Sequence, residues 1–173
     1  MIEKIKKSKV ITCIFIIVVG LTLYKIKLAN NFYKKHIGVN LPKKSTILKK
    51  EDGHGGFHGD GEYYSEIQLT EYGVKEFTNE ARKTGKWSSV PLPKDIKIIV
   101  YGGDYDGVSY NISEISKGIP QGIENGIYYI RDRFAERYPN EKNEKIYLRY
   151  AYNLTISILD FDTGKLYIYE LDT

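Results

Sequence analysis

Cysteine is almost absent from this chain of 173 residues, and the only one is Cys13. A single cysteine cannot form an intrachain disulfide, and no thiol is present after residue 13 for nucleophilic catalysis. The sequence also lacks a G-x-S-x-G elbow, an H-E-x-x-H zinc motif, a P-loop and a dinucleotide-binding fingerprint. We therefore assign no catalytic residue, and a non-enzymatic protein is favoured over an enzyme.

Acidic residues are nearly missing from the first 50 positions, where twelve lysines accompany one acid, Glu3. Residues 51–173 instead carry 14 Lys and Arg against 21 Asp and Glu. The net charge is thus +11 in the first part and −7 in the second, although the whole chain has only +4. Because an acidic domain repels phosphate, nucleic-acid binding by residues 51–173 is disfavoured.

Charged residues are also missing from positions 10–24, which read VITCIFIIVVGLTLY. Extended to Leu28, this segment forms a helix of about 28 Å, close to the thickness of the bilayer hydrocarbon. Four lysines precede it, as in the basic region of a signal sequence. We predict a basic cytoplasmic N-terminus over 1–9 and a transmembrane signal anchor over 10–28. It is expected to stay uncleaved, since no good small-residue cleavage site follows. A buried core helix is the alternative.

Residues 29–50, ANNFYKKHIGVNLPKKSTILKK, contain three Lys-Lys pairs and are predicted to be a basic juxtamembrane linker. The linker is either solvated or held against anionic headgroups, where each lysine contributes about 1 kcal/mol. A count of lysines alone places the C-terminal side in the cytoplasm. Long domains, however, cross membranes largely regardless of charge. We therefore expect a single-pass cell-membrane protein whose C-terminal domain, residues 51–173, is extracytoplasmic.

The domain shows strand-like alternation and one strong helix signal. Thr70 and Gly85 bracket a predicted helix over 71–84, with Val74, Phe77 and Ala81 as its buried stripe. A Gly-, Asp- and Asn-rich loop is expected over 102–126, with a short helix near 113–117. The turn chemistry of DFDTGK, 160–165, predicts a hairpin. Strands are expected over 63–69, 96–101, 127–134, 148–158 and 166–171.

The resulting order is β-α-β-β-β-β. Closely spaced late strands favour an antiparallel sheet of about five strands, covered on one face by one main helix. The predicted fold class is α+β. Most of the sixteen tyrosines are expected in the core or on the sheet, with their hydroxyls at the rim. An exposed aromatic face that suits a sugar or a protein partner is the alternative.

The segment EDGHGGFHGDGE, residues 51–62, concentrates histidines, carboxylates and glycines. His54, His58 and Asp60 offer nitrogen and oxygen ligands that suit zinc or another divalent transition metal. The glycines exclude a stable helix, so the spacing of the two histidines carries no further information. A compact turn cluster and an anion-binding backbone cradle remain alternatives. No other cofactor is expected.

Two arginines and the only tryptophan are candidate ligand-binding residues. In RDR, residues 131–133, Arg131 and Arg133 are predicted to share one face of a strand, where they could grip a carboxylate or phosphate. An intramolecular ion pair is the alternative. Trp87 opens the segment WSSVPLP, residues 87–93, which is predicted to be an irregular crossing stiffened by Pro91 and Pro93.

Four segments together carry a family resemblance: HGGFHGDGE (54–62), WSSVPLP (87–93), GIENGIYYIRDR (122–133) and YNLTISILDFDTGKLYIYELDT (152–173). Residues 51–173 resemble a family of small, uncharacterised, membrane-anchored proteins of Gram-positive bacteria of the clostridial and bacillar kind. The resemblance implies a location and a domain type. It implies no activity, because none is established for the family.

We therefore expect a single-pass membrane-anchored protein whose extracytoplasmic domain acts as a non-enzymatic binding or accessory module. Its expected partners are membrane lipid, through residues 10–28 and the basic linker, and a protein. Two other functions stay open. One is a metal-dependent protein or enzyme that uses His54, His58 and Asp60. The other is an immunity-type protein whose acidic surface meets a basic partner.

Overall fold

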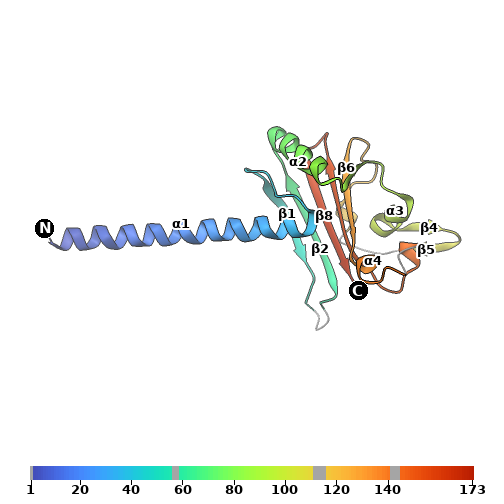
Figure 1. Cartoon of the computed structure of the whole chain (residues 1–173), viewed down its shortest axis with the longest axis horizontal. Helices are drawn as coiled ribbons and strands as arrows, with labels where there is room; N and C mark the ends of the chain where they lie inside the picture. Colours follow the sequence, from blue (N-terminus) through green and yellow to red (C-terminus); the bar gives the residue numbers. More distant parts are fainter. Residues whose placement is uncertain (1, 56–58, 111–115, 141–144) are drawn as a thin grey trace. The chain divides into compact units, whose positions relative to one another are not determined.

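The computed structural model describes residues 2–55, 59–110, 116–140 and 145–173. The chain divides into two compact units, residues 1–41 and 42–173. The first unit is formed mainly by one helix, α1 (Ile2–Ile37), drawn in blue in Figure 1. It runs without a break through the predicted N-terminus and span and into the predicted linker. The helix ends at Gly38, which has a φ of 77° and donates its N–H to the carbonyl of Lys34 at 3.0 Å.

The second unit is built on a six-stranded sheet in the order β1-β2-β8-β7-β6-β3, and every neighbouring pair is antiparallel. A separate hairpin pairs β4 with β5. The fold class is therefore α+β with an antiparallel sheet, as predicted. The strands are β1 (Thr46–Asp52), β2 (Gly61–Gln68), β3 (Trp87–Ser89), β4 (Gly103–Tyr105), β5 (Val108–Tyr110), β6 (Gly126–Asp132), β7 (Asn153–Asp160) and β8 (Lys165–Asp172).

The main helix of this unit, α2 (Glu71–Thr84), has the bounds predicted from its caps. The Thr70 hydroxyl accepts the N–H of Gly73 at 3.0 Å. At the other end, Gly85 is left-handed with a φ of 66° and donates its N–H to the carbonyl of Arg82 at 3.1 Å. Of the predicted stripe, Phe77 and Ala81 are buried. The Thr70 side chain and the Gly85 backbone therefore determine the two ends of this helix.

The hairpin between β7 and β8 also forms where the sequence predicts it. The Asp160 carboxylate accepts the N–H of Asp162 at 2.9 Å and the hydroxyl of Thr163 at 2.7 Å. Gly164 adopts a φ of 67° that favours glycine, and its N–H reaches the carbonyl of Asp160 at 3.0 Å. These bonds close the turn and pair β7 with β8 along almost their full length.

The prediction of a strand over 96–101 is wrong, because this segment belongs to the helix α3 (Lys94–Tyr101). Its isoleucines and valine are β-branched residues that are typical of strands. Their spacing, however, places Ile96, Ile99 and Val100 on one face, and all three are buried. The Asp95 carboxylate accepts the N–H of Ile96 at 3.0 Å, and Gly102 ends the helix. Burial of one face thus outweighs intrinsic propensity here.

Other boundaries differ from the predicted ones. The strand β1 begins at Thr46, within the predicted basic linker, and β3 lies in the predicted irregular crossing. The β4–β5 hairpin and a 3-10 turn, η1 (Ser116–Gly118), occupy part of the predicted loop. The rest of the short helix expected near 113–117 lies outside the described residues. The third predicted strand ends at Asp132, where α4 (Arg133–Arg137) follows.

The strand predicted to begin at Leu148 instead begins at Asn153. Residues Ile146–Leu148 form a 3-10 turn, η2, and the Arg149 N–H bonds to the carbonyl of Ile146 at 3.2 Å. The regular alternation of apolar residues therefore continues upstream of the strand without being part of it. From Asn153 onwards the predicted alternation holds, with Leu154, Ile156 and Ile158 in one cluster of the core.

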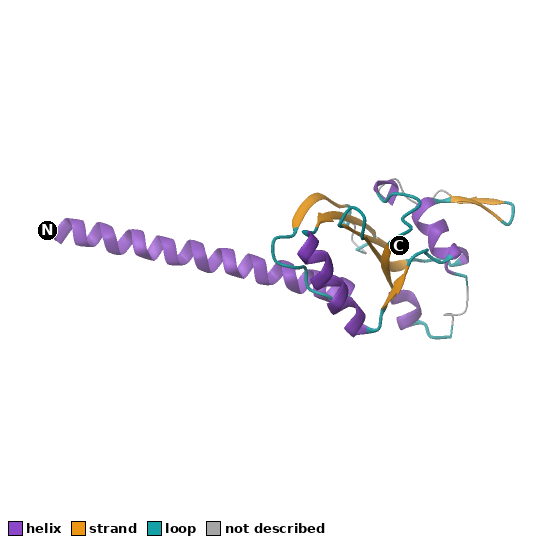
Figure 2. Ribbon diagram, turned by 90° about the horizontal axis from the view of Figure 1, so that it is seen from above, coloured by secondary structure: helices purple, strands orange, loops and turns teal. Residues whose placement is uncertain are grey.

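The prediction of about five strands covered on one face by one main helix is wrong in its details, because the main sheet has six strands and the helices α2 and α3 cover its opposite faces (Figure 2). On one face, the Phe77 ring of α2 packs edge-on against Trp87 at 5.1 Å, and Trp87 stacks on Tyr129 at 5.5 Å. On the other face, α3 joins buried strand residues in the main cluster. Two tyrosines packed in this cluster have hydrogen-bonded hydroxyls. Tyr64 donates to the carbonyl of Gly118 at 3.1 Å, and Tyr101 donates to that of Pro120 at 2.9 Å.

Candidate functional site

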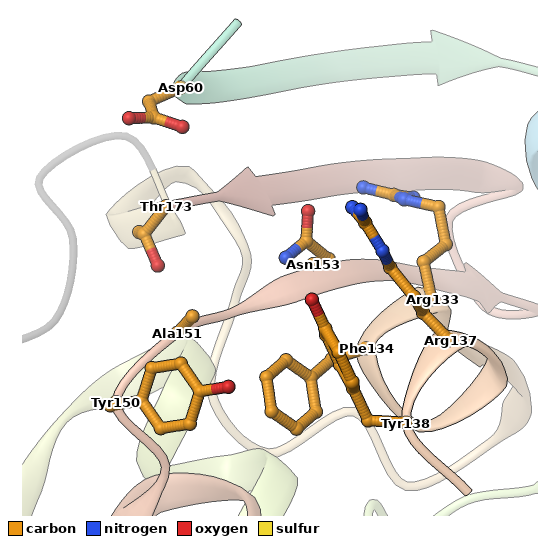
Figure 3. Close-up of a pocket in the computed structure, with 9 residues that line it drawn as sticks. All are labelled: Asp60, Arg133, Phe134, Arg137, Tyr138, Tyr150, Ala151, Asn153 and Thr173. Carbon is orange, nitrogen blue, oxygen red and sulfur yellow. The ribbon is translucent and has the colours of Figure 1, made fainter. Parts of the chain in front are cut away.

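A cavity of about 380 Å³ lies at one end of the sheet, where β7 begins, β8 ends and α4 follows β6. Its size is within the range of small-molecule sites. We call it the Phe134 pocket, after the buried ring that forms part of its lining (Figure 3). Its lining residues are Asp60, Arg133, Phe134, Arg137, Tyr138, Tyr150, Ala151, Asn153 and Thr173.

A largely buried ion pair lies next to the Phe134 ring. One oxygen of the Asp132 carboxylate accepts the Ala135 N–H at 2.9 Å and so caps α4. The other accepts from the Arg149 guanidinium at 2.6 Å. That guanidinium also lies 5.2 Å from the centre of the Phe134 ring. The start of α4 and the position of its aromatic residue are therefore determined by the same two side chains.

Two tyrosines contact Phe134 and form the aromatic part of the pocket. The Tyr138 ring lies 5.0 Å from the Phe134 ring, and the Tyr150 ring meets it edge-on at 5.4 Å. The Tyr150 side chain stays 76% exposed. The segment that carries it is tied to the end of β8, because the Tyr152 N–H donates to the Thr173 hydroxyl and the Thr173 N–H donates to the Tyr152 carbonyl, both at 2.8 Å.

Arg133 lines the same pocket, but its charge is already compensated. Its guanidinium donates to the Asp172 carboxylate and to the Thr155 hydroxyl. The carboxylate of Glu170, which is buried, lies 3.6 Å from it and accepts the Thr155 hydroxyl at 2.8 Å. This guanidinium therefore joins the ends of β7 and β8 and has little charge left for a ligand.

Three other lining side chains keep their hydrogen-bonding capacity. Within the described part of the chain, Arg137, Asn153 and Asp60 form no hydrogen bond or ion pair through their side chains. The contact of Arg137 is with the ring of Tyr138, 5.6 Å away. In the view of Figure 3, the Asn153 amide lies between Asp60 and the arginine side chains. A guanidinium, an amide and a carboxylate thus face a space bordered by aromatic rings.

His54 and Asp60, two of the residues predicted to bind metal, have different surroundings. His54 lies between two carboxylates, with Nδ1 3.0 Å from Asp52 and Nε2 3.3 Å from Asp172. Its hydrogen bond lowers the pKa of the Asp52 carboxyl below the usual value. Asp60 lines the Phe134 pocket, and His58 lies outside the described residues. Across the described ranges, no cluster of three or more His, Cys, Asp or Glu side chains could hold a metal ion.

Arg131 and Trp87 do not line the pocket. Arg131 makes a bidentate ion pair with Glu136, in which Nε and Nη2 each lie 2.9 Å from a carboxylate oxygen. This pair lowers the pKa of the Glu136 carboxyl. Trp87 is packed between Phe77 and Tyr129. The two arginines were predicted to share one strand face. They are separated instead, because β6 ends at Asp132 and Arg133 begins α4.

No local sequence pattern marks the other pocket residues. Arg137 is the last residue of α4, a helix of five residues, and Tyr138 comes directly after it, whereas Tyr150 and Asn153 lie at the start of β7 or shortly before it. The one available clue is Asp132, a good N-cap residue that marks the end of a strand and the start of a helix.

The architecture and the pocket define an α+β domain with an antiparallel sheet and a mixed aromatic and polar cavity at one sheet end. No family model, no curated protein and no solved structure matches the chain. In the helical part that the structure describes, no segment is both long enough and apolar enough for a membrane crossing.

Proposed function

We propose that this chain is a single-pass membrane-anchored protein whose α+β domain binds a ligand in the Phe134 pocket outside the cytoplasm. The observation that carries the binding function is the convergence on one cavity of tyrosine rings and of polar side chains that have no hydrogen-bond partner among the described residues. Among its described lining side chains there is one carboxylate and neither histidine nor cysteine. Such a set can orient a ligand, but it lacks the pairing of a nucleophile with a base that covalent catalysis uses. A binding role is therefore favoured over an enzymatic one.

The anchor is supported by the surface of α1. Ten large apolar side chains between positions 11 and 24 are exposed, from 40% for Val19 to 67% for Ile11 and Phe15. Transfer of such a side chain from water to an apolar medium contributes about 1.5–3 kcal/mol. A helix that is apolar on all sides is typical of a buried or membrane environment. Membrane insertion of this part of α1, flanked by lysines, therefore accounts for its composition.

Cell fractionation tests the anchor. The full-length protein should sediment with membranes and require detergent for its release. Val18→Lys introduces a charge in the centre of the proposed span, at a cost of about 2.5–3.5 kcal/mol, and should shift protein into the supernatant. Tyr72→Lys also introduces a lysine, but on the exposed surface of α2, and should leave the distribution between membrane and supernatant unchanged. Wild-type protein in the high-speed supernatant without detergent would overturn the anchor.

Protease accessibility tests the side of the membrane. A protease added to intact cells from which the wall has been removed should degrade the α+β domain, and a cytoplasmic marker should survive. Protection of the domain until the membrane is lysed would place it in the cytoplasm. That result would overturn the proposed location and leave the pocket unaffected.

Ligand-induced stabilisation tests the pocket. A ligand that binds only the folded protein raises its Tm. Three probe classes suffice: an uncharged oligosaccharide, poly(glycerol phosphate) and a mixed short-peptide pool. At least one class should raise the Tm of the wild type and fail to do so for Tyr150→Ala. Absence of any shift with all three classes would overturn the binding role.

The two other functions receive no specific support from the structure. The domain begins at Pro42 and includes the lysines of β1. Residues 42–173 carry 18 Lys and Arg against 21 Asp and Glu, so the net charge is −3, compared with −7 for residues 51–173. Attraction to a basic partner is correspondingly weaker. For the metal-dependent alternative, the Nδ1 atom of His54 is already hydrogen-bonded to the Asp52 carboxylate.

A further inference from the structure

The charges around the Phe134 pocket are close to balanced. Arg133 is paired with Asp172 and lies near Glu170, so it adds no positive excess. The charge of Arg137 is matched by the carboxylate of Asp60 in the same lining. Sites for phosphate or carboxylate ligands use an excess of cationic groups aimed at the anion. The pocket lacks this excess within its described lining, so its charge favours an uncharged ligand.

The aromatic groups offer flat apolar surfaces at the opening. Tyr150 is 76% exposed and Tyr138 is 38% exposed, while Phe134 is buried behind them. An exposed tyrosine ring provides apolar contact area on its face and a polar hydroxyl at its tip. A saccharide ring has the complementary form, with an apolar C–H face and hydroxyl groups around its edge. Stacking on Tyr150 would cover part of this exposed ring surface.

The polar groups match the edge of such a ring. Asp60 is an acceptor, Arg137 is a donor, and the Asn153 amide is both. A sugar hydroxyl donates one hydrogen bond and accepts others, so neighbouring hydroxyls can use all three side chains at once. A polyanion would meet Asp60 as a repulsive charge, and a purely apolar ligand would leave the three groups without partners. The volume of about 380 Å³ suits a small ligand segment better than a folded polypeptide.

We infer that the Phe134 pocket binds an uncharged oligosaccharide, with a sugar ring stacked on Tyr150 and its hydroxyls bound by Asp60, Asn153 and Arg137. This inference rests on the proposed binding function and names its ligand class. The sugar ring packs on the Tyr150 ring, and the three polar side chains determine its orientation. Arg133, Asp132 and Arg149 act as positioning residues, because they hold the sheet ends and α4 in place.

Isothermal titration calorimetry on the full-length protein tests the inference, in a detergent without a sugar headgroup so that the detergent cannot compete. The probes are the tetramers of N-acetylglucosamine, glucose and mannose at millimolar concentration. At least one tetramer should bind. Tyr150→Ala should raise its Kd about tenfold, which corresponds to roughly 1.4 kcal/mol. A loss of this size is typical of one aromatic contact. Tyr72→Ala is the matched control, because Tyr72 is also 76% exposed but lies on α2.

Asn153→Ala and Asp60→Asn provide a second readout that does not disturb the packing of Tyr150 on Phe134. Each should weaken saccharide binding severalfold without changing the Tm of the free protein. Absence of binding by all three tetramers would overturn the inference, and so would binding that is unaffected by Tyr150→Ala and Asn153→Ala. If poly(glycerol phosphate) binds instead, and Arg137→Gln abolishes that binding, the saccharide inference is wrong. The proposed binding function then stands with an anionic ligand.

Discussion

Asp132 and Arg149 are 17 positions apart, and their carboxylate and guanidinium are 2.6 Å apart. The Arg149 side chain is almost completely buried, and the Asp132 side chain is largely so. The same carboxylate caps α4 through the Ala135 N–H. One pair of charges therefore joins the end of β6, the start of α4 and the segment before β7, which are the elements that surround the Phe134 pocket.

Removal of one partner of this pair should be costly. Asp132→Ala removes the carboxylate that pairs with a buried guanidinium and also removes a helix cap, so we expect a loss of about 3–5 kcal/mol in the free energy of unfolding. Arg149→Met should cost less, since it replaces the buried charge by an apolar side chain of similar length. Denaturant unfolding of both variants measures the difference.

The control for this prediction is a pair of the same chemistry at the surface. Arg131→Met breaks the bidentate contact with Glu136, whose side chain is 53% exposed. Exposed ion pairs contribute about 0–1 kcal/mol, so the loss should be small. Equal losses for Asp132→Ala and Arg131→Met would contradict the role of burial.

A steric prediction concerns Gly126, at the start of β6. A Cβ atom at this position would overlap the backbone carbonyl of Leu159 on the neighbouring strand. Backbone in the middle of a sheet cannot move aside without breaking its ladder, so Gly126→Ala should lower the Tm by several degrees or prevent folding. Gly55→Ala is the control, because no atom of the described residues lies within 4 Å of its added Cβ. A Tm for Gly126→Ala equal to that of the wild type would show that the β6–β7 register differs.

The parts of the fold that could be predicted from sequence are those that depend on neighbouring residues. The helix α2 has a Thr70 cap, a Gly85 stop and apolar residues at helical spacing, and all three signals agree. The β7–β8 turn has Asp160 and Gly164 at the required positions. In α3 the signals disagree, because residues with strand propensity stand at helical spacing, and the buried face determines the outcome.

The pocket could not be predicted because its residues meet only in three dimensions. Asp60 precedes β2, Arg137 follows β6 and Asn153 starts β7, so no motif of fixed spacing contains them. The predicted pair of Arg131 and Arg133 depended on a strand that continues through residue 134. The Asp132 cap ends that strand and turns Arg133 towards the pocket. The helix-capping side chain of Asp132 therefore decides which of the two arginines lines the Phe134 pocket.

The N-cap of α2 allows a prediction of moderate size. Thr70→Ala removes the acceptor for the Gly73 N–H, and we expect a loss of about 1 kcal/mol in the free energy of unfolding. Thr70→Ser keeps a hydroxyl at the same place and should retain most of the stability. Chemical denaturation of the two variants distinguishes a capping role from a packing role. A loss for Thr70→Ser as large as that for Thr70→Ala would indicate that the methyl group matters instead.

Stability should fall at alkaline pH because of tyrosines in the main cluster of the core. Burial raises the pKa of Tyr101 from 10.0 to about 12, and it also raises the pKa of Tyr64. The unfolded chain loses these protons near pH 10, whereas the folded chain keeps them, so the unfolded state binds fewer protons above that pH. The free energy of unfolding therefore decreases as pH rises from about 10 towards 12.

Tyr101→Phe isolates this effect. The variant loses the hydrogen bond to the Pro120 carbonyl and should be less stable than the wild type at neutral pH. Its stability should also depend less on pH between 10 and 12, so the two curves should converge there. Denaturant unfolding at a series of pH values measures both effects, and the absorbance of tyrosinate follows the ionisation directly. Tyr72→Phe is the control, because its ring is exposed on α2 and its removal should leave the pH dependence unchanged. Parallel curves for Tyr101→Phe and the wild type would show that Tyr101 ionises with the same pKa in the folded and unfolded states.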